Sequence, residues 1–269
     1  MIALLCTVRD CATPLVREER RYVCANGHSF DVARSGYVNL LQPQDRRSKT
    51  PGDTPEAVNA RRRFLDRGFA QPLVQAIVDL LPLGRDEPLL DAGCGEGHHL
   101  GAFRRAHQVE GHGVDISIPA IDAASRRHRD CLFVVANADR FLPYADASFA
   151  AVASITARMN AEEFRRVLAP GGRLLVAIPG ADDLVELREA VLGGRVERDR
   201  VERTIELFPG FTLVRHELAK TIATLDPAAM IDVMTSSYRG LRPREREKLE
   251  AMSAMDVTLA RDLLLFAAT

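Results

Sequence analysis

The sequence predicts an α/β fold in which helices cover both faces of a mostly parallel sheet, with a small metal-binding module in front of it. Two observations support this prediction. Between residues 89 and 178, short apolar runs alternate with amphipathic helical patterns, which is typical of βαβ units. Before this region, three cysteines and a histidine stand in two close pairs within the first 28 residues.

The most informative stretch is residues 89–97, Leu-Leu-Asp-Ala-Gly-Cys-Gly-Glu-Gly. It predicts a buried strand, a tight turn and a helix start, because glycine permits turns and close ligand approach that a Cβ would prevent. Asp115 ends the next apolar segment, where a carboxylate can accept both hydroxyls of a ribose. The pattern therefore predicts a nucleoside-cofactor site. The alternative is an ordinary turn, with Asp115 capping the next helix.

The N-terminal pairs are Cys6-x4-Cys11 and Cys24-x3-His28. Thiolate and imidazole ligands suit Zn²⁺, and such a metal replaces the core that about 30 residues cannot build. With all four positions filled by protein, the predicted zinc is structural. The alternative is two unrelated buried cysteines and a surface histidine. We expect a zinc-binding module at 1–45, a linker and helical segment at 46–80, and the cofactor-binding domain at 81–269.

The elements follow from local signals. A helix is predicted from Thr54 or Pro55 through Arg67, with Glu56 in its first turn and basic residues later, and a second helix at 71–81. Ser117 and Pro119 open a third helix. The remaining expectations are Ile118, Ile121 and Ala124 on one face of that helix; strands at 131–136, 147–155 and 173–178; a capping box at Asn160 and Glu163 for a helix through Leu168, stopped by 170–172; a helix at 184–192; strands at 211–218 and 263–268; and a solvated helix face or lid at 195–203.

Composition narrows the function classes. The 269 residues are 46% hydrophobic and 27% charged with a formal net charge of −1, which is ordinary for a globular chain and argues against indiscriminate nucleic-acid binding. Up to residue 70, however, twelve Arg or Lys face eight Asp or Glu. No apolar run could span a membrane, and the N-terminus does not match a secretory signal, so we expect a cytoplasmic protein.

Residues 28–41 (His-Ser-Phe-Asp-Val-Ala-Arg-Ser-Gly-Tyr-Val-Asn-Leu-Leu), 51–53 (Pro-Gly-Asp) and 61–68 (Arg-Arg-Arg-Phe-Leu-Asp-Arg-Gly) are more specific than these motifs. With them, the chain resembles the bacterial large-subunit ribosomal RNA guanine-N1 methyltransferases, over nearly its whole length. The resemblance implies a Rossmann-like class I methyltransferase domain that uses S-adenosylmethionine, behind a zinc finger that helps to hold an RNA hairpin. It also allows a homodimer.

The resemblance implies roles for individual residues. Cys6, Cys11, Cys24 and His28 would bind zinc; Asp91, Gly93, Gly95, Glu96 and Gly97 would surround the methionine and ribose of the cofactor; Asp115 would bind the ribose; and Asn137 or Asp139 would reach the adenine amino group.

Four positions depart from the family pattern. The first cysteine pair is spaced by four residues where two are usual; Phe69-Ala70 replaces a His-Tyr pair; Asp183 replaces a His after the fifth strand; and Thr156-Ala157-Arg158 replaces an aromatic-Ala-Pro motif.

The last three departures concern the pocket. Candidates there are Asp183, His98 and His99 near the N1 proton, and Thr156 or Arg158 against the base or a phosphate. Two alternatives follow: an S-adenosylmethionine-dependent enzyme with a different acceptor, either a small molecule or another RNA, and an RNA-binding relative with impaired catalysis.

Overall fold

The computed structural model describes residues 2–45, 48, 50–194, 199–237 and 241–268. The strands are β1 (Leu15–Arg17), β2 (Arg21–Cys24), β3 (Ser29–Asp31), β4 (Val38–Asn39), β5 (Pro88–Ala92), β6 (Glu110–Asp115), β7 (Leu132–Val135), β8 (Phe149–Ile155), β9 (Leu168–Pro179), β10 (Phe211–Leu225) and β11 (Met255–Ala268). The helices are the short 3₁₀ helix η1 (Pro43–Asp45), α1 (Pro55–Asp66), α2 (Gln71–Leu80), α3 (His98–His107), α4 (Ile118–Arg127), α5 (Ala161–Val167), α6 (Val185–Leu192), α7 (Val201–Glu206), α8 (Pro227–Thr235) and α9 (Pro243–Glu250).

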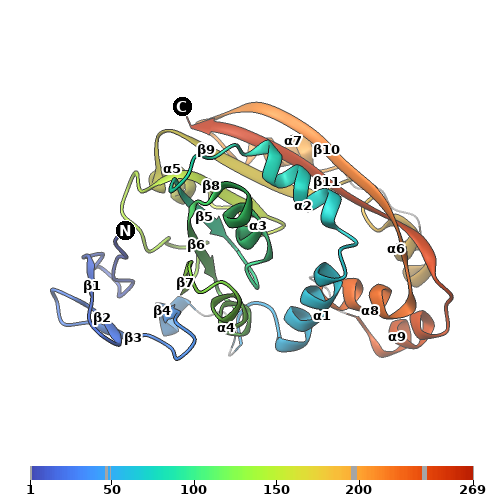
Figure 1. The fold of residues 1–269 in the computed structure, drawn as a ribbon, viewed down its shortest axis with the longest axis horizontal. Coiled ribbons are helices and arrows are strands. Elements are labelled where there is room, and N and C mark those ends of the chain that lie inside the picture. Colours follow the sequence, from blue (N-terminus) through green and yellow to red (C-terminus); the bar gives the residue numbers. More distant parts are fainter. Residues whose placement is uncertain (1, 46–47, 49, 195–198, 238–240, 269) are drawn as a thin grey trace.

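An eight-stranded sheet runs through the molecule in the order β10-β11-β9-β8-β5-β6-β7-β4 (Figure 1). The strands from β4 to β9 pair in parallel, whereas β11 is antiparallel to both β9 and β10. The predicted α/β class is confirmed. Because the parallel strands end at one edge, the loops after β5, β6, β7, β8 and β9 meet there.

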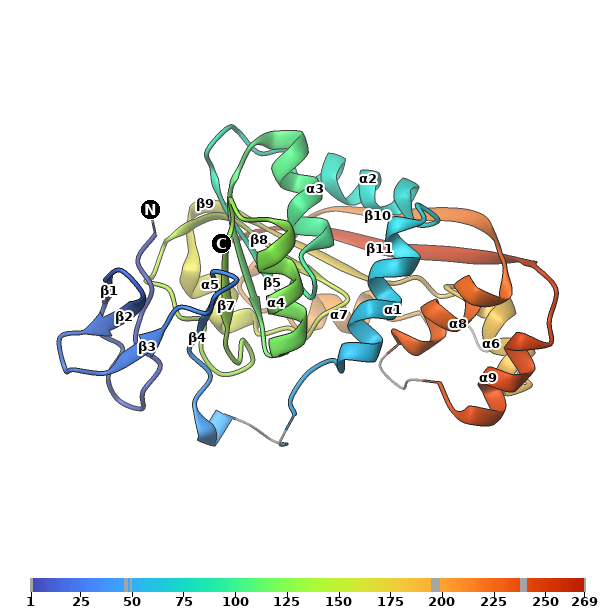
Figure 2. The same ribbon diagram turned by 60° about the horizontal axis from the view of Figure 1, so that its bottom comes forward.

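Helices cover both faces of this sheet, each over its own buried core. Ile77 of α2, Phe103 of α3 and Ile121 of α4 pack on one face. Phe164 of α5 packs on the other, in a cluster that also contains Leu4 and other apolar residues of the N-terminal module. That module, with its own sheet β1-β2-β3, lies at one end of the molecule, and α1, α6, α8 and α9 gather at the opposite end (Figures 1 and 2).

Several predicted helix starts are confirmed by their caps. The Thr54 side chain accepts from the Ala57 N–H at 3.2 Å, and the Ser117 hydroxyl accepts from the Ala120 N–H at 3.3 Å. Asn160 accepts from the Glu163 N–H at 3.2 Å. These bonds satisfy backbone donors that the first helical turn leaves free.

Other expectations were wrong in detail. Ile118 is exposed, because it stands at the first residue of α4, before the helix reaches its packed stretch. The strand expected at 173–178 begins at Leu168, directly after α5, and passes through the Pro-Gly-Gly segment with a register shift.

The last two strands are much longer than expected, and α8 and α9 were not predicted. Charged residues interrupt the apolar pattern of β11 up to its midpoint, and each has a partner: Asp256 accepts from Thr224 at 2.6 Å, Arg261 lies 2.7 Å from Asp183, and Asp262 lies 2.8 Å from His216. Asp226 caps α8 by accepting from Ala229. Of the expected lid at 195–203, residues 195–198 lie outside the described part, and α7 begins at Val201.

Candidate active site and metal centre

The glycine turn follows β5 at the carboxyl edge of the sheet, and together with Asp91 and Asp115 it is called the cradle here. Gly93 and Gly95 have φ angles of +84° and +54°. A Cβ on Gly93 would lie 2.3 Å from the Cβ of Ala157, which belongs to the loop after β8. Glycine is thus required here both by the backbone angle and by the packing of a second loop.

Two carboxylates lie behind this turn, the buried Asp91 and the half-buried Asp115. Asp115 accepts from the Gly95 N–H at 2.9 Å and from the Ser117 N–H at 2.8 Å. Burial raises its pKa, against the lowering effect of these bonds. Asp91 is 1% exposed, and neither of its oxygens has a hydrogen-bond partner of ordinary geometry in the described part of the chain.

Burial raises the pKa of Asp91 to about 8, and the charges of Asp115 and Glu96 add to this effect. A buried carboxylate without a hydrogen bond of ordinary geometry is costly, and a cationic ligand group offsets the cost. S-adenosylmethionine carries two such groups, its sulfonium and its ammonium. The carboxylates of Asp91 and Asp115 therefore fit S-adenosylmethionine, the cofactor that the sequence predicts.

Arg61 of α1 closes the cradle from the linker side. Its Nε donates to Glu96 at 2.8 Å and its Nη2 donates to Asp53 at 2.6 Å, while the Ser117 hydroxyl donates to the Asp53 carbonyl at 2.8 Å. These two carboxylates raise the pKa of Arg61 despite its burial. The sequence did not reveal this role. Arg61 stands in a run of three arginines, and basic residues are expected in the second half of a helix because they complement its dipole.

The two candidates for the adenine end lie in the loop after β7, the second strand from β5 in the sheet. Asn137 donates through Nδ2 to the Asp45 carbonyl at 3.1 Å and accepts through Oδ1 from the Asp139 N–H at 3.1 Å. The Asp139 carboxylate lies 3.6 Å from Arg158 of the loop after β8. The structure thus places both candidates in one loop, and it ties Asp139 to a residue predicted for the acceptor side.

The predicted acceptor residues come from two neighbouring loops. Thr156 follows β8 with a φ of +52°, and its N–H donates to the Ala177 carbonyl at 2.8 Å. Asp183, after β9, is buried and accepts from the Ala260 N–H at 2.9 Å. It also lies 2.7 Å from Nη1 of Arg261, a residue that sequence reasoning did not single out.

His98 and His99 open α3 directly after the glycine turn. Burial lowers the pKa of both, to about 3 for His99, so neither is charged at neutral pH. Phe69 does not join these groups. Its ring centroid lies 5.5 Å from that of Phe64, and the Arg67 guanidinium lies over the ring.

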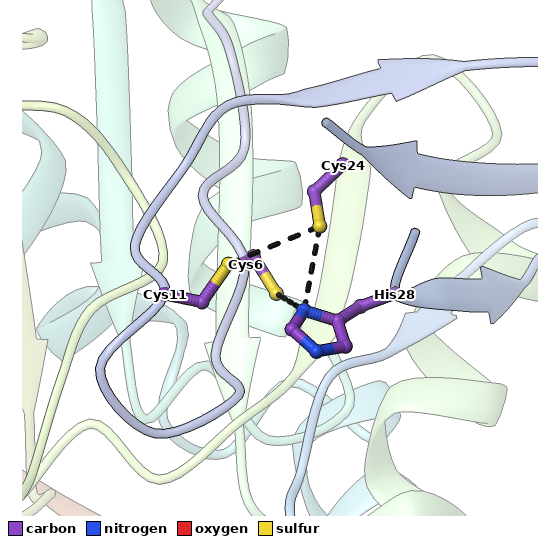
Figure 3. A group of neighbouring side chains, drawn as sticks. All are labelled: Cys6, Cys11, Cys24 and His28. Atoms are coloured by element: carbon purple, nitrogen blue, oxygen red, sulfur yellow. Dashed lines mark hydrogen bonds between the residues drawn. The ribbon is translucent and has the colours of Figure 1, made fainter. Parts of the chain in front are cut away.

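The four predicted metal ligands converge at the N-terminal module (Figure 3). The Cys6 and Cys24 sulfurs both lie 3.4 Å from Nδ1 of His28, and the Cys11 sulfur lies 3.9 Å from that of Cys24. A tetrahedral Zn²⁺ with bonds of about 2.0–2.3 Å separates its ligands by about 3.5–3.8 Å. The group therefore fits zinc, and the longer first pair does not prevent it.

Contacts fix this module to the large sheet. The Leu5 N–H donates to the Pro143 carbonyl at 2.9 Å, and the Leu40 N–H, directly after β4, donates to the Val135 carbonyl of β7 at 2.9 Å. Between the Cys6–Ala12 loop and the end of β7 lies a cavity of about 210 Å³, bordered by Arg9 and Arg140. It lies at the module boundary, whereas the cradle lies after β5.

Comparisons with known proteins agree with this layout. The family model described as "RlmA, N-terminal" matches residues 5–49, and one described as "Methyltransferase domain" matches residues 89–172. The 23S rRNA (guanine(748)-N(1))-methyltransferase of Streptomyces fradiae is 38% identical over 226 residues, which cover 82% of this chain and 80% of that protein. A Bacillus subtilis protein provisionally named for 23S rRNA guanine-N1 methylation is 32% identical, over 89% of this chain and 88% of its own length.

Among solved structures, a SAM-dependent methyltransferase from Thermotoga maritima superposes with a TM-score of 0.50. It is 19% identical and covers 80% of this chain and 98% of its own. At that identity the likeness concerns the fold alone.

Proposed function

This chain belongs to the bacterial 23S rRNA (guanine-N1)-methyltransferase family, and we propose that it transfers the methyl group of S-adenosylmethionine to N1 of a guanine in a hairpin of large-subunit ribosomal RNA. The proposal rests mainly on the alignment with the Streptomyces fradiae relative, which spans most of both chains. The joint presence of a Cys₃His cluster and an acidic glycine cradle supports it.

The cofactor supplies a methyl group on a positively charged sulfur. Around it, we assign Asp91 to a cationic part of the cofactor and Asp115 to the ribose hydroxyls, with the backbone of Gly93, Gly95 and Gly97 in close approach. Glu96, tied to Arg61, fixes the turn. Asn137 or Asp139 would meet the adenine amino group. Since displacement at carbon is in line, the main work of these residues is positioning.

The RNA would approach from the zinc end of the molecule. Exposed arginines of the module supply the charge for phosphate contacts: Arg9, Arg17, Arg20, Arg21 and Arg34. We keep 1–45 as the zinc-binding unit, 46–80 as the connecting segment and 81–269 as the catalytic unit. The target base would leave its stack to reach the cradle, as base-modifying enzymes require.

On the acceptor side, we assign Thr156 and Arg158 to the rim of the base pocket and Asp183 to its wall. Thr156 and Arg158 are exposed, and both follow β8 next to the Gly93–Ala157 contact. Asp183 is buried behind Arg261.

The departure from the family motif at 156–158 favours one second candidate, a methyltransferase with a different acceptor, since those residues border the pocket. An RNA-binding relative with impaired catalysis is the third. No helix in the described segments is long and apolar enough to cross a bilayer. We propose a cytoplasmic enzyme, which would be consistent with an rRNA substrate, and a homodimer as its assembly.

Radiolabelled S-adenosylmethionine, offered with unmodified 23S rRNA, with 16S rRNA and with a panel of small-molecule acceptors, tests these readings. We expect transfer to 23S rRNA above the other acceptors. Transfer to another acceptor alone would support the second candidate. Cofactor binding without any transfer would support the impaired relative.

A further inference from the structure

Arg261 lies at the edge of the sheet where the acceptor base is expected, although it belongs to no recognised motif. It pairs in register with Pro179, the last residue of β9. It therefore reaches the carboxyl end of the parallel strands, even though its own strand is antiparallel. Ligands of open α/β sheets bind beyond these ends. A permanent positive charge thus stands on the acceptor side of the sheet.

The guanidinium of Arg261 is held in place through one nitrogen. Nη1 donates to the Ala260 carbonyl at 2.7 Å and lies 2.7 Å from Oδ1 of Asp183. The Asp183 carboxylate is itself fixed by the Ala260 N–H and is 8% exposed. Both of these contacts use Nη1 of Arg261, so neither of them occupies its Nε–H or Nη2 donors. The Arg261 side chain is 25% exposed.

His99 of α3 lies within the electrostatic range of both Arg261 and Arg61. Burial is the main cause of its low pKa, and the charges of His98, Arg261 and Arg61 lower it further. His99 therefore lies within electrostatic reach of Arg261 on one side and of Arg61, which binds Glu96 in the cradle, on the other. In the described part of the chain, Asp183 after β9 and His99 on α3 are titratable groups near Arg261, while Lys220 of β10 pairs with Asp182.

We propose that Arg261 is a catalytic residue that donates hydrogen bonds to O6 of the target guanine. This rests on the proposed function. The N1 proton leaves to water, and the negative charge spreads onto O6, where a preorganised cation stabilises it. N1 then bonds to the methyl carbon while the carbon–sulfur bond breaks, and its electron pair stays on sulfur. The products are 1-methylguanine and S-adenosylhomocysteine. Asp183 is the positioning residue for Arg261.

Single-turnover rates of methyl transfer to 23S rRNA, measured between about pH 6 and pH 10, test this proposal. The variants are Arg261→Met, Arg261→Lys and Asp183→Asn, each in the full-length zinc-loaded protein. Arg215→Met is the matched control, because Arg215 pairs with Glu217 on exposed β10 and is 64% exposed. Cofactor affinity is measured in parallel by calorimetry.

We expect Arg261→Met to be about 100-fold slower than the wild type at neutral pH, the usual cost of removing one stabilising donor. The deficit should shrink as the pH rises, because hydroxide then ionises N1 without help. Arg261→Lys should be intermediate, Asp183→Asn should show a smaller shift in the same direction, and Arg215→Met should match the wild type within about twofold, as expected for an exposed surface change. Cofactor affinity should not change.

A pH profile of Arg261→Met that runs parallel to that of the wild type would overturn the proposal. If that variant does not fold, by circular dichroism, Arg261→Lys decides in the same way: an unshifted profile overturns the proposal, and a shift to higher pH supports it. A wild type that methylates no RNA at any pH would instead overturn the proposed function, and this inference with it.

Discussion

The Cβ of Ala157 fills the space into which a side chain on Gly93 would project, 2.3 Å from where that Cβ would lie. The loop after β8 and the turn after β5 are therefore locked together. Under the proposed function, the loop carries two residues of the acceptor side and the turn carries the cofactor. The contact at Ala157 would then help to place the methyl donor relative to the acceptor, and the chain keeps this alanine although both of its neighbours differ from the family motif.

Gly93→Ala should break this lock. The substitution places a methyl group against Ala157 at a φ of +84°, so overpacking and backbone strain add to a loss of about 2–4 kcal/mol in the free energy of unfolding. Affinity for S-adenosylmethionine should fall at least about tenfold, which is 1.4 kcal/mol. Gly193→Ala is the control, since Gly193 has a φ of +79° but no atom within 4 Å of its Cβ position. Equal losses in both variants, measured by urea unfolding and calorimetry, would refute the role of the contact.

The affinity for the cofactor should depend on pH through Asp91. Its pKa of about 8 means that the carboxyl is mostly protonated at pH 6–7, whereas the anion is the form that binds a cation. Affinity should therefore rise as the pH increases from 6 to about 9, by up to about tenfold per unit below the pKa. Asp91→Asn should bind weakly and without this dependence. A wild-type affinity that stays flat over this range would contradict the assignment.

The same raised pKa has a consequence for stability. Between the ordinary pKa of an aspartate, 3.8, and about 8, the folded protein holds a proton on Asp91 that the unfolded chain releases. This contribution to stability is complete below pH 3.8 and is lost as the pH rises towards 8. Without cofactor, the wild type should lose more stability over pH 5–8 than Asp91→Asn does, as urea titrations at several pH values would reveal. Equal losses of stability in the wild type and in Asp91→Asn would contradict the raised pKa of Asp91.

Arg61→Met should destabilise the cradle. It removes the cation between Asp53 and Glu96, and the Glu96 side chain is only 4% exposed, so a buried charge loses its partner. We expect a loss of about 2–3 kcal/mol in unfolding free energy, somewhat below a fully buried pair because Arg61 is 28% exposed. Arg126→Met, which breaks the exposed pair with Asp122, should cost less than about 0.5 kcal/mol. Thermal and urea unfolding measure the stability of both variants. Similar losses of unfolding free energy would show that Arg61 does not stabilise the cradle more than an exposed ion pair does.

Zinc removal should separate RNA recognition from cofactor binding. Cys24→Ser deletes one of four ligands that lie within 4.8 Å of one another, and elemental analysis should then find far less than one zinc per chain. Methylation of rRNA should fall at least about tenfold, while the affinity for S-adenosylmethionine stays within about twofold, since the cradle is built from other elements. Cys131→Ser, outside the cluster, should retain zinc and activity. Loss of cofactor binding together with zinc would show that the site is not independent of the module.

The sequence was most informative where chemistry dictates spacing. The ligand pairs around Cys6 and Cys24 and the strand–turn–helix at Asp91 could be predicted, because each needs particular residue types within a short span. The caps of Thr54, Ser117 and Asn160 were visible for the same reason. In these places local signals and tertiary structure agree.

What could not be predicted depends on contacts between distant segments. Arg261 and Asp183 are 78 residues apart and meet because β11 returns along β9. The first half of β11 was hidden by its charges, whose partners lie on β10 and in the loop after β9. Arg61 meets Glu96 only after α1 folds back over the glycine turn. No periodicity in the sequence signals such pairings.

Mapping the methylated nucleotide decides whether the methyl group goes to N1 of a ribosomal guanine. Unmodified 23S rRNA is incubated with the purified protein and S-adenosylmethionine, then analysed by primer extension and by mass spectrometry of its nucleosides. We expect one cofactor-dependent stop at a guanine in a hairpin loop, together with 1-methylguanosine as the new nucleoside. A methyl group on another nucleoside, or no transfer by a protein that binds the cofactor and retains its zinc, would contradict the proposed function.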